Sequence, residues 1–174
     1  MVSPNDVTIR LLTESDWEAL REIRLRALRT EPGVFFRAHA EEIGKTDDEW
    51  KEWARGSDGG GRMFGLFASG QLVGITGAVP WREDPSGATV VLVASYIAPE
   101  YRGLGLTSLL YDARLTWIRS QPRFKRIIVS HRRTNEPSGK AIRRNGFTHV
   151  GTVSRAWPDG TLDDEVCYEM KLNP

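Results

Sequence analysis

Alternating and helical apolar patterns divide the chain into short elements. Val7, Ile9 and Leu11 alternate with Thr8, Arg10 and Leu12, which predicts a strand with one buried face. Later apolar runs are separated by turn residues, and two helices are preceded by capping-box sequences. The pattern predicts strand 7–12, helix 13–31, helix 46–53, strands 63–68, 72–81 and 89–98, helix 104–120, strand 127–130, helix 135–145, and strands 149–155 and 165–172.

The order β-α-α-β-β-β-α-β-α-β-β predicts an α+β fold, a mixed three-layer α/β arrangement with a mostly antiparallel sheet of about seven strands and about four helices. A length of 174 residues is enough for one sizeable core, so we expect a single domain over residues 1–174. Residues 34–44 show no clean period, and the Gly-rich stretch 55–62 is expected to be a mobile connection.

Composition narrows the functional classes. A net charge of +1 with 27% charged residues gives no reason to expect nucleic acid as a partner. Cys167 is the single cysteine, which excludes an intrachain disulfide and a cysteine-based zinc site. No apolar stretch approaches the roughly 18 residues of a membrane span, and residues 1–6 do not resemble a leader sequence. We therefore expect a cytoplasmic protein with no membrane association and no metal.

The most informative segment runs from Ser95 to Thr107, where an apolar strand passes through a proline and a glycine-containing turn into a helix. Gly103 and Gly105 allow the main chain to approach a ligand closely. Successive N–H groups and the positive end of the helix dipole then favour an anion. Each charged hydrogen bond contributes roughly 1.5 to 3 kcal/mol, so several together hold a diphosphate without a metal.

Two other phosphate-binding motifs fit this segment poorly. A Walker loop ends in Gly-Lys-Ser or Gly-Lys-Thr, and a dinucleotide fingerprint needs a third glycine and a later acidic residue. Neither is present in the sequence around residues 102–126. The remaining alternative is a strand-to-helix turn that uses glycine for steric reasons alone.

The segment resembles the signature of the GNAT acetyltransferase superfamily, with Arg102, Gly105 and Thr107 at its three defining positions. Thr107 is bulkier than the small residue usual there. Residues 135–147, from Asn135 to Gly-Phe, resemble the Asn-led helix of the same family at the same length. With the strand order, the resemblance extends from residue 7 to 172 and is weakest over residues 34–62.

The resemblance implies a sheet that splays after strand 89–98 to admit acetyl-CoA as co-substrate, with the pantetheine arm in the gap. Asn135 is expected to contact this arm, although it also suits the N-cap of its helix. A main-chain N–H near Ile97 would polarise the thioester carbonyl. The implied cofactor-binding residues are Tyr96, Ile97, Arg102, Gly103, Leu104, Gly105, Leu106, Thr107 and Asn135.

The catalytic residues are less clear, because Ile142 occupies the position where many family members carry a tyrosine acid. Ser138 and His131 are the nearest replacements in the sequence, and each has a structural alternative: the first helical turn for the serine, a packed position for the histidine. Glu83 and Asp84 are possible bases or solvated turn residues.

The resemblance implies an N-acetyltransferase that acts on the amine of a small molecule, amino-acid derivative or peptide by direct attack in a ternary complex. A non-catalytic acyl-CoA-binding module is the main alternative, favoured by Ile142. Rossmann-type nucleotide binding fits the strand order poorly. The acceptor side is expected at residues 25–44, 81–87 and 155–164, and family habit alone suggests a homodimer. The clustered cations Lys125, Arg126, Arg132, Arg133, Arg143 and Arg144 could meet the 3'-phosphate of CoA or form a solvated face.

Overall fold

The computed structural model describes residues 7–56 and 60–172 of the chain and contains one seven-stranded sheet of order β1-β2-β3-β4-β5-β7-β6. The central part of the predicted connection 55–62 lies outside the described residues. All neighbouring strands are antiparallel except β4 and β5, which are parallel. The strands are β1 (Val7–Leu11), β2 (Arg62–Ala68), β3 (Gln71–Pro80), β4 (Thr89–Ile97), β5 (Arg126–Arg132), β6 (Thr148–Ala156) and β7 (Leu162–Lys171).

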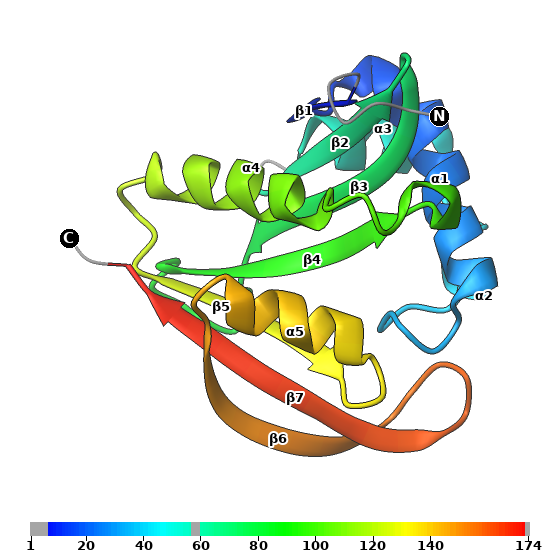
Figure 1. The fold of residues 1–174 in the computed structure, drawn as a ribbon. Helices are drawn as coiled ribbons and strands as arrows, with labels where there is room; N and C mark the ends of the chain where they lie inside the picture. The colour runs from blue at the N-terminus through cyan, green and yellow to red at the C-terminus, as the bar shows by residue number, and fades with distance from the viewer. Residues whose placement is uncertain (1–6, 57–59, 173–174) are drawn as a thin grey trace.

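Helices cover both faces of this sheet, which confirms the predicted three-layer α+β fold (Figure 1). One core packs α1 and α3 against β2 and β3, and another packs α4 and α5 against β4, β5 and β7. The helices are α1 (Trp17–Thr30), α2 (His39–Glu42), α3 (Asp47–Arg55), α4 (Thr107–Arg119) and α5 (Glu136–Arg144), with short 3-10 turns η2 (Glu14–Asp16) and η3 (Pro99–Tyr101).

Local sequence signals account for most element boundaries. The capping box of Thr46 with Glu49 forms in full, and at Thr13 the main-chain N–H donates to Asp16 as its capping box predicts. The four-residue α2 was not predicted, because one turn is too short to show a helical period. Helix α4 begins at Thr107 rather than at residue 104, since Gly103 and Gly105 have positive φ values of 78° and 74° that end helical geometry.

The buried face of α4 is wider than the predicted one. We expected Leu106, Leu109, Leu110, Ala113 and Trp117 to share that face. Leu106 and Leu110 are buried and the other three are half-buried, but the structure also buries Tyr111, Arg114, Leu115 and Ile118. The extra width follows from the position of α4, which packs against both the sheet and α5. A charged residue, Arg114, therefore lies in the core.

No helix among residues 7–56 and 60–172 is long and apolar enough to cross a membrane. Within the same ranges, no three His, Cys, Asp or Glu side chains gather in a way that could hold a metal ion.

Candidate active site

The gap between β4 and β5 creates the site. Their pairing covers only three positions and ends at Val91 opposite Ile128, after which the two strands diverge (Figure 1). A β-bulge interrupts the other edge of β4, where Ile75 pairs with Tyr96 but Gly77 pairs with Val93. Bulges bend strands. The sheet therefore opens between β4 and β5 on the side where β4 leads into the glycine turn.

The bulge also changes which side chains of β4 face α4. Ala94 has a positive φ of 57°, unusual for a residue with a Cβ, and adds one residue to the strand. Val90 and Leu92 pack in the α4–α5 core before the bulge, and Ile97 packs in the core beneath α4 after it. Such a one-residue shift reverses the alternation of a strand. Tyr96 accordingly points into the α1–α3 core.

A cleft of about 1240 Å³ passes through this gap and joins the α4–α5 side to the loops around α1 and α2. All the predicted cofactor residues line it except Leu104, whose side chain is exposed instead. His131, Ser138 and Glu83 also line the cleft. The structure therefore brings the two sequence motifs and the candidate catalytic residues to one cavity.

One end of the cleft is the glycine turn. Within the part of the chain that the structure describes, the main-chain N–H groups of residues 103–107 have no hydrogen-bond acceptor, and Leu106 caps α4 without a side-chain bond. A Cβ added at Gly103 or at Gly105 would meet no atom within 4 Å. Unpaired donors, open space and a helix N-terminus together suit an anionic group.

The side chain of Arg102 braces this turn rather than facing it. Its Nε donates to the carbonyl oxygen of Ile97 at 2.8 Å, and its Nη2 donates to Glu31 on the adjoining loop after α1. Ala98 donates its main-chain N–H to Val73 on β3. Since successive residues of a strand direct their N–H groups to opposite edges, the N–H of Ile97 is directed toward the gap.

Helix α5 forms the opposite wall of the gap. Asn135 caps it, because its side-chain oxygen accepts from the main-chain N–H of Ser138 at 3.4 Å. The structural alternative for Asn135 is thus confirmed, while the residue also lines the cleft. The hydroxyl of Ser138 has no hydrogen-bond partner among the described residues. It is therefore available to a molecule in the cleft.

Both ring nitrogens of His131 have partners, so the side chain is not free to act on a substrate as a base. Its Nδ1 lies 2.7 Å from the carbonyl oxygen of Arg132, its Nε2 lies 3.3 Å from the hydroxyl of Tyr168, and the two rings stack. Burial lowers its pKa, only partly opposed by the backbone hydrogen bond, so the ring is neutral at pH 7. A Cβ on Gly139 would approach Nε2 to 2.6 Å, so α5 packs directly on the ring.

A family model for the acetyltransferase (GNAT) domain matches residues 6–148 of the chain. The chain belongs to the GNAT acetyltransferase family. The family model thus includes the glycine turn and the Asn-led helix, the two motifs on which the resemblance rested.

Comparisons with individual GNAT proteins agree. A phosphinothricin N-acetyltransferase from Streptomyces coelicolor is 33% identical over 107 residues, which are 60% of this chain and 61% of that protein. The chain thus spans less than two thirds of this curated relative. A GNAT-family acetyltransferase from Streptococcus pneumoniae superimposes with a TM-score of 0.81, at 19% identity and over 96% and 99% of the two chains. A putative acetyltransferase from Salmonella typhimurium, solved with its cofactor acetyl-CoA, gives 0.77, at 19% identity and over 97% and 95%.

The other end of this GNAT cleft contains a buried ion pair that the sequence did not reveal. Arg24 on α1 donates from Nε and Nη2 to the carboxylate of Glu42 on α2, at 3.0 and 2.8 Å. Its Nη1 is buried without a partner, and its guanidinium stacks on Phe35 and Trp53. The two charged residues are 18 positions apart across an irregular segment, so no local pattern joins them.

The structure places the two candidate bases Glu83 and Asp84 and one member of the predicted basic cluster, Arg132, in different surroundings. Asp84 accepts hydrogen bonds within its own turn, from the N–H and hydroxyl of Ser86, while Glu83 lines the cleft.

Arg132 is not solvated: it donates to Asp159 at 2.7 Å, to Asp163 at 2.8 Å and to the carbonyl of Gly33 at 3.0 Å. These bonds tie the α1–α2 loop to the β6–β7 hairpin, two of the three segments expected on the acceptor side.

Proposed function

We propose that this protein transfers an acetyl group from acetyl-CoA to the amine of a small molecule, amino-acid derivative or peptide. The observation that carries the proposal is one cleft with unpaired main-chain donors at one end. At the other end it has an acceptor chamber, lined by Arg24, Glu42, Phe35 and Trp53. Such a cleft allows a donor and an acceptor to meet in the gap of the sheet, as direct attack in a ternary complex requires.

The cofactor would bind along β4. The N–H groups of residues 103–107 would receive the pyrophosphate, and the free edge of β4 beyond Val91 would pair with the pantetheine arm. The N–H of Ile97 points into the gap and would polarise the thioester carbonyl. Asn135, at the start of α5, would contact the arm from the opposite wall while it caps its helix.

Of the two catalytic residues suggested by the sequence, Ser138 is better placed. Its hydroxyl is open to the cleft, whereas both ring nitrogens of His131 are engaged by Arg132 and Tyr168. We assign Ser138 to hydrogen bonding at the reacting end of the cofactor. His131, whose Nε2 lies 3.3 Å from the hydroxyl of Tyr168, would act as a proton relay through that hydroxyl.

The acceptor chamber favours an amine that also carries an anionic group. Arg24 uses one edge of its guanidinium for Glu42, which leaves Nη1 and the second proton of Nη2 without an acceptor. A buried donor without a partner costs roughly 1 to 3 kcal/mol, which a bound carboxylate would recover. Glu52 and Glu83 also line the cleft and would suit the ammonium form of the same molecule.

Coenzyme A release measured with a thiol reagent, over a panel of amines and amino-acid derivatives, tests the proposed function. Acetylation of at least one amine, confirmed by the mass of the product, is the expected result. Acetyl-CoA binding with no transfer to any acceptor would contradict it and favour the non-catalytic module. We further propose a cytoplasmic location, which fractionation would check, and a homodimer, which light scattering of the purified protein would check.

A further inference from the structure

Arg114 presents an anomaly in the core of the protein. Its side chain is 1% exposed, and no carboxylate among residues 7–56 and 60–172 lies within 4.0 Å of its guanidinium. Nη1 donates to the hydroxyl of Ser95 at 2.9 Å, Nε donates to the carbonyl of Leu110 at 3.1 Å, and Nη2 has no partner. Burying a cation without a counter-charge lowers the stability of the fold, which suggests a function for the residues that contact Arg114.

Two of these neighbours face the cleft. Ser95 lies on β4 directly after the bulge residue, and Tyr111 lies on α4 with its ring 4.5 Å from the guanidinium carbon of Arg114. Both residues line the cleft. Ser95 and Tyr111 connect the charge of Arg114 to the cleft between β4 and β5, because both contact Arg114 and line the cleft.

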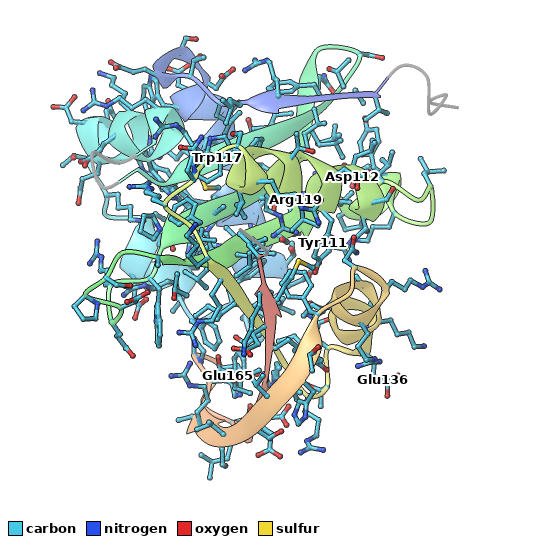
Figure 2. All side chains as sticks on the ribbon, turned by 90° about the vertical axis from the view of Figure 1, so that its left-hand side faces the viewer. Tyr111, Asp112, Trp117, Arg119, Glu136 and Glu165 are labelled. Carbon is cyan, nitrogen blue, oxygen red and sulfur yellow. The ribbon has the colours of Figure 1, made fainter. Side chains whose placement is uncertain are left out.

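Tyr111 occupies the space between α4 and α5. Figure 2 shows it on the side of α4 that faces α5, and its ring contacts that of Phe147 edge to face, with the centroids 6.3 Å apart. It shares a core cluster with Ile142, the residue at the position of the usual family tyrosine. Tyr111 lines the cleft. A phenol thus reaches the same cleft from the neighbouring helix.

On the basis of the transferase function proposed above, we propose that Tyr111 is the acid that protonates the departing thiolate and that Arg114 is its positioning residue. The amine nitrogen attacks the thioester carbonyl carbon and forms the C–N bond. The C–S bond then breaks, its electron pair leaves on sulfur, and the phenol proton of Tyr111 moves to that sulfur. Water in the cleft accepts the proton that the amine loses and returns one to the phenolate.

The environment of Tyr111 fits this role. Burial raises the pKa of its phenol, while the positive charge of Arg114 acts in the opposite direction. The phenol is therefore protonated at neutral pH, and the phenolate that forms in the reaction is stabilised by the adjacent cation. The aliphatic hydroxyl of Ser138 is a much weaker acid than a phenol, so hydrogen bonding rather than proton donation suits it.

The test begins with kcat at saturating substrates for Tyr111→Phe. We expect kcat to fall about 100-fold, at the low end for a general acid, because a thiol of pKa about 8.5 can also leave as thiolate. The Kd for acetyl-CoA, measured by titration calorimetry, should not change. Unchanged kcat in Tyr111→Phe would overturn the proposal. If the wild-type protein binds acetyl-CoA but acetylates no amine, the transferase function itself fails and this proposal with it.

A second variant separates catalysis from packing. A fluorinated tyrosine at position 111 has nearly the same shape but a more acidic phenol, so the alkaline limit of kcat should move to lower pH. Because a cation lowers the pKa of a nearby phenol, Arg114→Gln in that background should move the limit back to higher pH. The same fluorinated residue at Tyr101 should leave the limit in place. An alkaline limit that does not respond to position 111 would refute the assignment.

Discussion

The unpartnered Nη1 of Arg24 leads to a quantitative prediction about which acceptors the protein prefers. The double variant Arg24→Gln with Glu42→Gln removes both members of the buried pair together, so neither charge is left alone in the core. We expect this variant to lose its preference for acceptors that carry a carboxylate beside the amine.

The size of the effect follows from the bonds involved. A hydrogen bond to a charged group contributes roughly 1.5 to 3 kcal/mol, and about 1.4 kcal/mol corresponds to a tenfold change in rate. The exposed side of the same helix offers a control, Arg21→Gln, whose loose contact with Asp47 is 3.9 Å long between exposed side chains. The carboxylate preference should therefore fall roughly ten- to hundredfold in the double variant and stay unchanged in the control.

The assay compares kcat/KM for an amino acid and for its amide with each protein. The preference is the ratio of these two values, and dividing the wild-type ratio by the variant ratio cancels the intrinsic difference between the two amines. Equal ratios in the wild-type protein and the double variant would refute the assignment of Arg24, whatever the affinities of the two proteins for acetyl-CoA.

Three further changes have defined outcomes. Asn135→Ala removes the cap of α5 and should lower the free energy of unfolding by about 0.5 to 2 kcal/mol in chemical denaturation, while Asn135→Ser should restore most of it. Hydrogen bonds from Arg132 and then Thr134 lower the pKa of Asp163 to about 2, so their stabilisation is complete above the ordinary value of 3.8 and is lost as the pH falls through about 2. Melting temperatures from pH 5 to pH 2, a range set by that pKa shift, should decline less in Arg132→Met than in the wild-type protein; equal slopes would contradict the role of Arg132. Ser138→Ala should reduce kcat by about tenfold, as expected for one lost hydrogen bond, and a loss larger than that in Tyr111→Phe would reverse the two assignments.

Local signals account for the parts of the fold that the sequence predicted well. The capping boxes, the glycine turn and the Asn-led helix each lie within a few consecutive residues, so their structure follows from nearby side chains. The widening between β4 and β5 was expected only from the family resemblance. The bulge at Ala94 could not be predicted, because an Ala-Ser pair between strand-forming residues does not by itself specify an extra position.

The polar residues of the core were harder to predict for a related reason. The buried face of α4 depends on α5, an element from another part of the chain, so Tyr111 and Arg114 did not stand out. Arg24 and Glu42 meet through the packing of α1 against α2. Because arginine and glutamate are mostly found at protein surfaces, hydrophobic patterns predict that residues such as Arg24, Glu42 and Arg114 are exposed.

Binding of acetyl-CoA to the glycine turn is the central claim, and calorimetry tests it directly. Gly105 has open space around its Cβ position, so Gly105→Glu places a carboxylate beside the N–H groups that we assign to the pyrophosphate. The account predicts micromolar binding by the wild-type protein and its loss in the variant, with both proteins folded by circular dichroism. Absence of binding by the wild-type protein, or undiminished binding by the folded variant, would contradict it.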